Sequence, residues 1–255
     1  MVDVAGRERA VLNILDEWPW DEGGVLIGGY AISAYGPPRY SVDVDVVIPV
    51  EAAGIIRSWL RGFGFDRTDY AVSNPQNYEG LVERYRSQAV TLDLLSGAVR
   101  DRDARVDVPE EWISKNCRGL VLETLTGKTT RRIPIARPEA LWALKLQSGR
   151  DHDLSDLFVI SDQATDLNEV RQLFEMLATD SLTRKLRSVR SKLSDRRLFE
   201  DSLSRRQLGR PGNPQNIRRW QRFVSRVDSI VVPLLSKSPA KAGESPPSER
   251  ARGLH

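Results

Sequence analysis

The chain has very little of the chemistry that cross-links small proteins or binds zinc. It contains 1 Cys and 2 His among 255 residues, so it cannot form an internal disulfide or a zinc site of Cys and His ligands. A single thiol, Cys117, is typical of a reducing compartment, and we expect a cytoplasmic protein. No apolar run approaches the roughly 20 residues of a membrane helix, and the start lacks the profile of a secretion signal. We therefore expect no membrane partner.

Lysine is also scarce, and positive charge is unevenly placed. Of the 38 Lys and Arg residues only 7 are Lys, and the formal net charge is +3. Residues 181–230 hold 14 Lys and Arg against 4 Asp and Glu. Arginine suits bidentate contacts to phosphate, and positive charge at this density attracts a polyanion such as RNA. The alternative is a basic face that contacts only solvent.

The order of patterns along the chain predicts an α+β protein. Short apolar or alternating segments predict strands over 25–27, 42–48, 81–86, 89–95, 120–125 and 131–135. Helical periodicity is found over 7–17, 28–35, 51–60 and 139–147, and it alone continues to about residue 234. We expect a mixed sheet flanked by helices over residues 1–136, a basic helical domain over 137–235, and a disordered tail over 236–255.

Two aspartates alternate with valines in the segment Val42-Asp-Val-Asp-Val-Val-Ile48. Because side chains alternate between the two faces of a strand, Asp43 and Asp45 point the same way, with carboxylates about 6–7 Å apart. Such a pair is tolerable when a divalent cation lies between the two charges, and magnesium combines carboxylate with phosphate ligands. The pattern indicates metal-assisted phosphoryl transfer. The alternative is an edge strand with its polar face in solvent.

A third acid and a glycine pair add to this pattern. Asp93 stands inside the apolar segment Val90-Thr-Leu-Asp-Leu-Leu95, where it is either a further metal ligand or a strand-end aspartate. Gly28 and Gly29 directly follow a predicted strand and open a helical segment, a place where backbone N–H groups favour an anion. Together the three carboxylates favour a metal site.

These motifs resemble the nucleotidyltransferase superfamily with the DNA polymerase beta type of fold. Gly28-Gly-Tyr-Ala, Arg39-Tyr-Ser and Asp43-Val-Asp are similar to the AbiEii/MenT-like nucleotidyltransferase toxins. Lys145-Leu-Gln-Ser-Gly-Arg-Asp-His-Asp-Leu-Ser-Asp-Leu157 resembles a second motif of that branch. The resemblance covers roughly residues 20–160. The sequence departs from the pattern at His152, where Lys is usual, and at Ser41, where Thr is usual.

The resemblance implies a role for each matched residue. Asp43 and Asp45 would hold two Mg²⁺ ions, and Asp93 would complete the catalytic one and take the proton of the acceptor hydroxyl. Lys145 would neutralise charge on the triphosphate of the nucleotide. The further nucleotide-binding positions that it implies are Gly28, Gly29, Arg39, Ser41, Asp153 and Asp156.

Several of these positions have a second interpretation. Arg39 contacts phosphate or base, or is a surface residue after a Pro-Pro turn. Asp153 or Asp156 orients Lys145 or touches the base, or belongs to a charged helical surface. Trp220 in the basic region is either a core residue or a stacking residue for RNA.

The resemblance implies a Mg²⁺-dependent enzyme that moves a nucleoside monophosphate from an NTP to a hydroxyl. The basic helices point to RNA as the acceptor, and the toxin resemblance to the 3′ end of tRNA and to an antitoxin partner. One alternative is the same chemistry on a small molecule of the antibiotic type. Another is a catalytically silent RNA-binding or regulatory module on the same fold.

Overall fold

A computed structural model describes the chain except for residues 1–2, 42, 73–80, 88–89, 206–207 and 238–255. Most of the tail expected over 236–255, and the first residue of the strand expected over 42–48, lie outside the described residues. The strands are β1 Val25–Ile27, β2 Asp43–Ile48, β3 Asp66–Val72, β4 Leu81–Arg86, β5 Thr91–Ser96, β6 Ala98–Arg100, β7 Asp107–Pro109, β8 Cys117–Leu120 and β9 Ile133–Ala136.

Helices precede, interrupt and follow these strands. They are α1 Val4–Glu17, α2 Gly28–Ser33, α3 Ala53–Gly62, α4 Glu110–Lys115, α5 Pro138–Ser148, α6 Asp151–Ile160, α7 Leu167–Met176, α8 Asp180–Leu193, α9 Arg196–Arg205 and α10 Pro214–Lys237, with a 3-10 turn at Trp20–Glu22. None of the described helices has both the length and the apolar character needed to cross a membrane.

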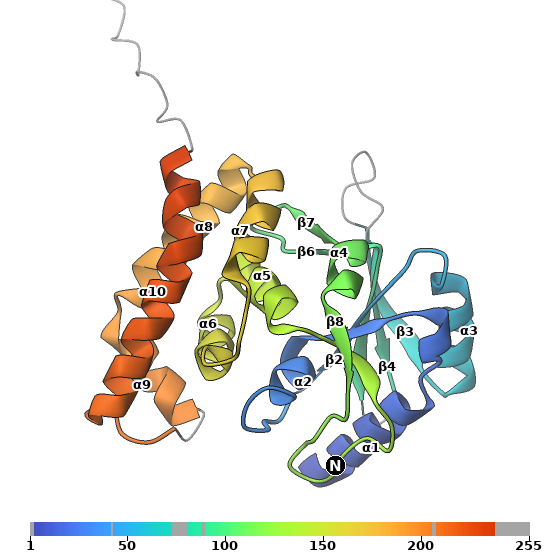
Figure 1. The fold of residues 1–255 in the computed structure, drawn as a ribbon. Helices are drawn as coiled ribbons and strands as arrows, with labels where there is room; N and C mark the ends of the chain where they lie inside the picture. The colour runs from blue at the N-terminus through green and yellow to red at the C-terminus, as the bar shows by residue number, and fades with distance from the viewer. Residues whose placement is uncertain (1–2, 42, 73–80, 88–89, 206–207, 238–255) are drawn as a thin grey trace, which may run out of the picture.

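Seven strands form one mixed sheet in the order β3-β4-β5-β2-β1-β9-β8 (Figure 1). β2 runs parallel to β5 and β1 parallel to β9, whereas the other neighbours in this sheet are antiparallel. The expected α+β class with a mixed sheet is confirmed. Because β9 ends at Ala136 and no strand follows it in the described residues, we propose the boundary between a sheet domain and a helical domain at this point.

Two parts of the sheet differ from the sequence expectation. β3 was not predicted, because its segment Asp66–Val72 is polar and lacks a long apolar alternation. The predicted hairpin over 120–125 and 131–135 exists, but its ladder pairs Cys117–Leu120 with Ile133–Ala136, farther from the turn. Toward the turn, strand pairing is reduced to an isolated bridge between Glu123 and Lys128. There the Thr124 and Thr129 hydroxyls donate hydrogen bonds to the carbonyls of Gly127 and Arg131.

The two faces of β4 carry opposite charges. Glu83 is buried on the side of α3, where it accepts hydrogen bonds from Arg57 at 2.8 Å, Arg67 at 3.0 Å and Tyr85 at 3.0 Å. Its neighbour in sequence, Arg84, points to the other face, since side chains alternate along a strand. Helix α3 therefore covers one face of the sheet, and a site can form on the other face, toward which Arg84 points.

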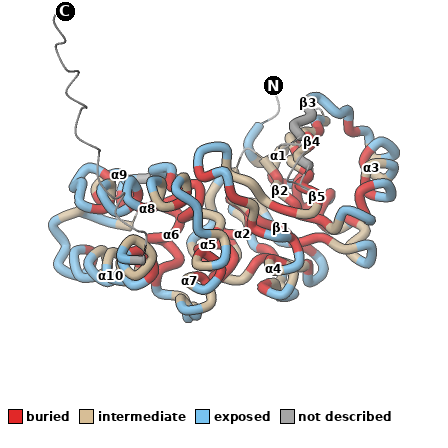
Figure 2. The backbone as a smooth tube through the Cα atoms, turned by 90° about the horizontal axis from the view of Figure 1, so that it is seen from above, coloured by how far each residue is buried: buried red, intermediate tan, exposed pale blue. Residues whose placement is uncertain are grey.

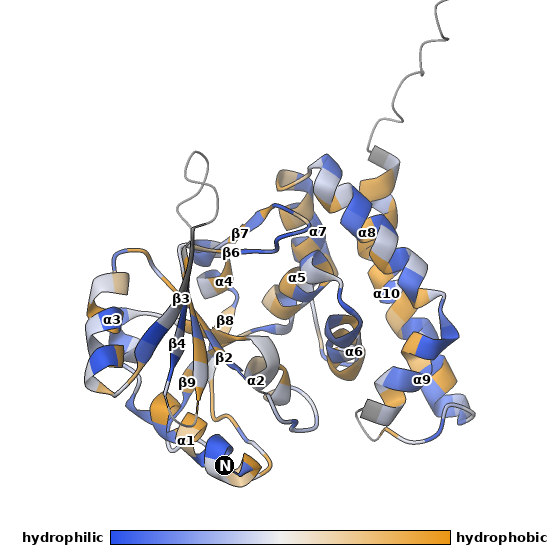
Figure 3. Ribbon diagram, turned by 180° about the vertical axis from the view of Figure 1, so that it is seen from behind, coloured by the Kyte–Doolittle hydropathy of each residue, from blue (hydrophilic) through white to orange (hydrophobic). Residues whose placement is uncertain are grey.

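The helices after β9 form a block whose buried apolar residues belong to the same continuous core as those of the sheet. Leu182, Leu186, Val189 and Leu193 of α8 are buried, as their helical spacing predicts. Figure 2 shows buried segments running through this block, and Figure 3 shows apolar and polar residues alternating along α8, α9 and α10. Trp220 packs against the rings of Phe158, Phe199 and Phe223, so it belongs to the core of the helical block.

Candidate active site

A row of charged side chains crosses three adjacent strands. Asp45 of β2 is the register partner of Asp93 of β5, and Asp93 is the partner of Arg84 of β4. Register partners point to the same face of a sheet, with Cβ atoms about 5 Å apart. The next row, two residues earlier along β2, consists of Asp43, Thr91 and Arg86. The three aspartates singled out by the sequence therefore share one face of the sheet.

Asp43 and Asp45 are both harder to ionise in the folded protein than in water. Burial, and next the negative charge of Asp93, raise the pKa of Asp45 to about 7. Burial and Asp93 likewise raise the pKa of Asp43 above its usual range. The positive charges of Lys145 and Arg84 oppose the shift at Asp45. This side of the site carries more negative charge than its own cations neutralise, which is the electrostatic condition for binding a further cation.

The glycine pair lets the backbone approach these side chains. Gly28 has φ +69°, and a Cβ atom built on it would lie 2.0 Å from Asp45 Oδ2. A Cβ atom on Gly29 would lie 2.3 Å from the Ser41 hydroxyl and 2.8 Å from Arg39 Nη2. Ser41 in turn donates to the Asp43 carbonyl at 3.3 Å. At both positions the neighbouring side chains leave no room for a Cβ atom, so the site requires glycine there.

We expect Gly28→Ala to destabilise the protein more than Gly64→Ala. Gly64 also has a positive φ, +83°, but a Cβ atom there would meet nothing within 4 Å. The control carries only the backbone strain of a left-handed alanine, about 1–2 kcal/mol, whereas Gly28→Ala adds the overlap with Asp45, about 1–3 kcal/mol more. Urea denaturation of the two variants measures the difference. Equal losses of stability would show that Asp45 does not pack against Gly28.

A buried lysine stands opposite the acids. Lys145 of α5 is 11% exposed, and its Nζ contacts Asp153 Oδ1 at 2.6 Å and Asp156 Oδ2 at 3.0 Å. Arg39 also contacts Asp156, at 3.0 Å, and Arg150 contacts Asp153 at 2.7 Å. Burial alone would raise the pKa of Asp153, but Lys145 and Arg150 lower it to about 2. Where α5 meets α6, these five side chains therefore form one network of ion pairs.

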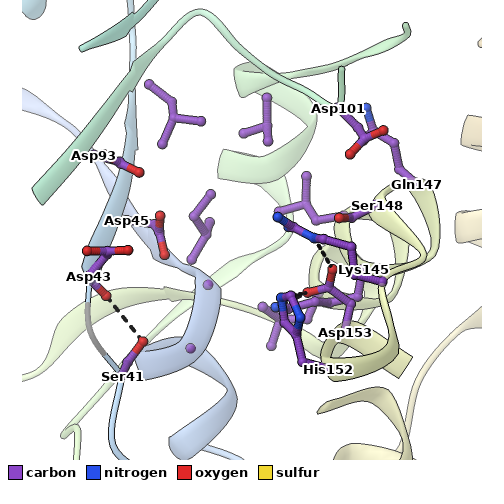
Figure 4. Close-up of a pocket in the computed structure, with 18 of the residues that line it drawn as sticks. Ser41, Asp43, Asp45, Asp93, Asp101, Lys145, Gln147, Ser148, His152 and Asp153 are labelled. Atoms are coloured by element: carbon purple, nitrogen blue, oxygen red, sulfur yellow. Dashed lines mark hydrogen bonds and ion pairs between the residues drawn. The ribbon is translucent and has the colours of Figure 1, made fainter. Parts of the chain in front are cut away.

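The aspartates of the sheet and the charged residues of α5 and α6 line a cleft of about 430 Å³, a size that suits a small ligand. Figure 4 shows Asp43, Asp45 and Asp93 on one side of it and Lys145, His152 and Asp153 on the other. Gly28, Gly29, Arg39 and Ser41 also line the cleft. Asp156 is not among its lining residues, although it contacts both Lys145 and Arg39. His152 is 53% exposed near the start of α6.

Some residues that line the cleft were not predicted from the sequence. Arg84 is the most important of these, because it binds Asp93 directly. The short connection between the two predicted strands was the available signal, since it fixes which residues of a hairpin lie opposite each other. Other such lining residues are Leu95, Val99, Leu141, Leu144, Gln147 and Ser148.

Comparison with known protein families identifies the chain as a nucleotidyltransferase. The chain belongs to the nucleotidyl transferase AbiEii toxin family of type IV toxin–antitoxin systems, whose family model matches residues 11–233. This confirms the resemblance found in the motifs. The search among curated proteins gave no match.

Several solved structures are similar to the chain. ANT(2")-Ia in complex with adenylyl-2"-tobramycin has 16% sequence identity and a TM-score of 0.36, with 73% of this chain and 99% of that chain covered. A Helicobacter pylori protein described as a nucleotidyltransferase has 18% identity and a TM-score of 0.35, covering 92% and 96%. JHP933 from Helicobacter pylori has 19% identity and a TM-score of 0.34, covering 92% and 93%.

Proposed function

We propose that the protein transfers a nucleoside monophosphate from an NTP to a hydroxyl group of RNA, at the 3′ end of tRNA, with Mg²⁺ bound by Asp43, Asp45 and Asp93. The observation that carries this proposal is the position of the three carboxylates on adjacent strands, across one cleft from Lys145. Carboxylates suit the metal, and the lysine suits the phosphates of the nucleotide.

The chemistry of the acidic residues fits a magnesium ion. Their oxygen atoms are the ligands that Mg²⁺ prefers, and it binds through one or two carboxylates together with substrate phosphates. The raised pKa of Asp45, about 7, reflects its burial and the nearby charge of Asp93, and a bound cation would relieve that cost. When bound, Mg²⁺ would lower the pKa of the attacking hydroxyl and screen the phosphates.

The residues of the chain divide the remaining work. The acceptor oxygen bonds to the α-phosphorus, the bond from that phosphorus to the β-bridging oxygen breaks, and pyrophosphate leaves. Asp93 takes the proton of the hydroxyl on a carboxylate oxygen. Lys145 neutralises charge on the triphosphate, held in place by Asp153 and Asp156. Gly28 and Gly29 let the phosphates approach the backbone, beside Arg39 and Ser41.

The acceptor is assigned from charge. Helices α8, α9 and α10 lie in the region where basic residues outnumber acidic ones by 14 to 4. Some of these cations are used internally, as in the pair of Arg190 with Asp228 at 2.9 Å. Arg184, Arg187, Arg197 and Arg218 are exposed. A surface of this kind binds a phosphate backbone.

The family adds a proposed partner and a proposed setting. Its members are toxins of toxin–antitoxin systems, so we propose that a cognate antitoxin protein acts on this enzyme. We propose the cytoplasm as the site of the reaction, since the proposed substrates are tRNA and NTPs and the sequence has a single cysteine.

The test offers each labelled NTP with Mg²⁺ to total RNA. We expect the full-length protein to label RNA and Asp43→Ala to reduce labelling by about 10³-fold, the scale of losing one electrostatic contact in a transition state. Asp66→Ala, which changes an exposed aspartate at the start of β3, is the matched control and should label RNA normally. Equal labelling by the wild type and Asp43→Ala would overturn the site.

Two additions to this assay separate the alternatives: an antibiotic offered as acceptor, and a measurement of metal and nucleotide binding. Labelling of an aminoglycoside or lincosamide while RNA stays unlabelled would identify the small-molecule enzyme. Binding of metal and nucleotide without any transfer would identify a silent RNA-binding module. A silent module is not expected, because the three aspartates and Lys145 all line the same cleft. A small-molecule acceptor is not expected, because the exposed arginines of α8, α9 and α10 suit a polyanion.

A further inference from the structure

One cation of the chain is bound directly to the acidic site. Arg84 donates from Nε to Asp93 Oδ1 and from Nη2 to Asp93 Oδ2, each at 2.7 Å. This bidentate geometry is the strongest pairing that a side-chain cation makes with a carboxylate. The Asp93 side chain is 15% exposed and that of Arg84 is 42% exposed. Asp93 is therefore held on both of its oxygen atoms.

This pairing has a consequence for metal binding. In the part of the chain that the structure describes, no three Asp, Glu, His or Cys side chains lie close enough together to hold a metal ion. The acids are present on one face and in register, but the carboxylate of Asp93 is directed to Arg84. The charge of Arg84 also acts on Asp43 and Asp45, where it lowers the pKa of each against the larger effect of burial.

We infer that Arg84 is the internal counter-ion of the acidic site, and that a divalent cation and Arg84 compete for Asp93. The inference rests on the proposed function, since the competing cation is the one that transfer requires. Without metal, Arg84 neutralises part of the repulsion among the carboxylates. With metal, Arg84 withdraws toward solvent, which its partial exposure and flexible side chain permit. Arg84 is thus a positioning residue that sets the concentration of divalent cation needed to occupy the site.

The sign of one effect separates this role from a simpler one. If Arg84 only orients Asp93 as a metal ligand, its removal disorders the ligand and weakens metal binding. If Arg84 competes with the metal, its removal tightens metal binding, because the cation no longer has to displace it. If Arg84 mattered for folding alone, its removal would not tighten metal binding either.

The experiment measures Mn²⁺ binding to the full chain by electron paramagnetic resonance, without NTP or RNA. For Arg84→Ala we expect the dissociation constant of Mn²⁺ to fall by about tenfold, the effect of removing a charge-assisted pair of ordinary strength. Arg84→Lys keeps the charge but loses the bidentate contact, so its constant should lie between the two. Arg86→Ala is the control for loss of a nearby positive charge, since Arg86 lies two residues along the same face and its charge acts on Asp43. Its constant should fall by less than that of Arg84→Ala, because the register partner of Arg86 on β5 is Thr91 and not an aspartate.

Thermal unfolding gives an independent readout. In EDTA, Arg84→Ala should unfold at a lower temperature than wild type, because its carboxylates lose their counter-ion. Saturating Mn²⁺ should raise the unfolding temperature of Arg84→Ala more than that of wild type, since tighter binding stabilises more at equal ligand concentration.

Unchanged or weaker Mn²⁺ binding by Arg84→Ala overturns the inference. Absence of Mn²⁺ binding from wild type and variants alike overturns it as well. Failure of this inference stays distinguishable from failure of the proposed function, because Asp43→Ala is judged by transfer to RNA and Arg84→Ala by metal binding alone.

Discussion

Asp45→Asn is expected to abolish nucleotide transfer and at the same time to stabilise the metal-free protein at pH 8. The folded protein raises the pKa of Asp45 to about 7, first by burial and then through Asp93. Keeping this carboxylate ionised in the folded state therefore costs about 2–4 kcal/mol at pH 8. Asparagine has nearly the same shape and no charge, so the variant escapes this cost while it loses a metal ligand.

The sign of the pH dependence follows from the direction of the shift. Because the pKa of Asp45 is higher in the folded state, the folded state binds the proton more tightly. Wild type therefore loses stability as the pH rises from about 4 to 7, the window between the unfolded and folded values. Asp45→Asn lacks this loss, so its advantage appears at pH 8 and disappears at pH 4.

Thermal unfolding in EDTA at both pH values measures this effect. A gain of about 2–4 kcal/mol corresponds to a rise of about 4–16 °C in the unfolding temperature at pH 8. Asp66→Asn, at the exposed start of β3, controls for the loss of one negative charge and should change little. A variant that is less stable than wild type at pH 8 would contradict the proposed electrostatic cost.

Asp153→Asn should have the opposite effect and destabilise the protein strongly. Asp153 is fully buried and pairs with Lys145, which is itself 11% exposed. Removing one partner of a buried ion pair costs about 3–5 kcal/mol when the other charge is left without a partner. Lys145 keeps Asp156 at 3.0 Å, so we expect a loss near the lower end of that range. Asp151→Asn is the matched control, because Asp151 lies in the same turn, is 65% exposed and pairs with Lys192. That exposed pair contributes about 0–1 kcal/mol.

Urea denaturation at pH 7 and at acidic pH tests this prediction. The network lowers the pKa of Asp153 to about 2, so its contribution is fully present above about pH 4 and is lost as the pH falls through 2. The gap between wild type and Asp153→Asn should shrink over that interval. The double variant Lys145→Met with Asp153→Asn should recover part of the stability, since it removes the buried lysine that lost Asp153 while Asp156 keeps its contact with Arg39. No recovery would mean that the loss has another cause.

The sequence predicted the acids well and their partners poorly. Strict alternation with valine placed Asp43 and Asp45 on one face, because the strand period alone decides it. Asp93 stood out as an acid inside an apolar segment, but periodicity could not say that its strand lies beside that of Asp43 and Asp45. The contact of Lys145 with Asp153 depends on the corner between α5 and α6, where Gly149 adopts a left-handed conformation. The network there could be anticipated only in outline.

Arg84 shows where reasoning from the sequence ends. Its strand was predicted over 81–86 with the same bounds as β4, but its partner was not. A shift of one residue in pairing moves every side chain to the other face. The residue facing Asp93 therefore depends on the hairpin register, which composition and periodicity leave open.

The alternation of Glu83 and Arg84 also disfavours a shifted pairing of β4 with β5. A slip of β4 by one position would set Glu83 against Asp93 and carry Arg84 beneath α3, beside Arg57. Acid would then oppose acid and base would oppose base on both sides of the strand. Like charges facing each other disfavour this register. Arg84, which faces Asp93, and Glu83, which binds Arg57 of α3, therefore also favour the observed pairing of β4 with β5.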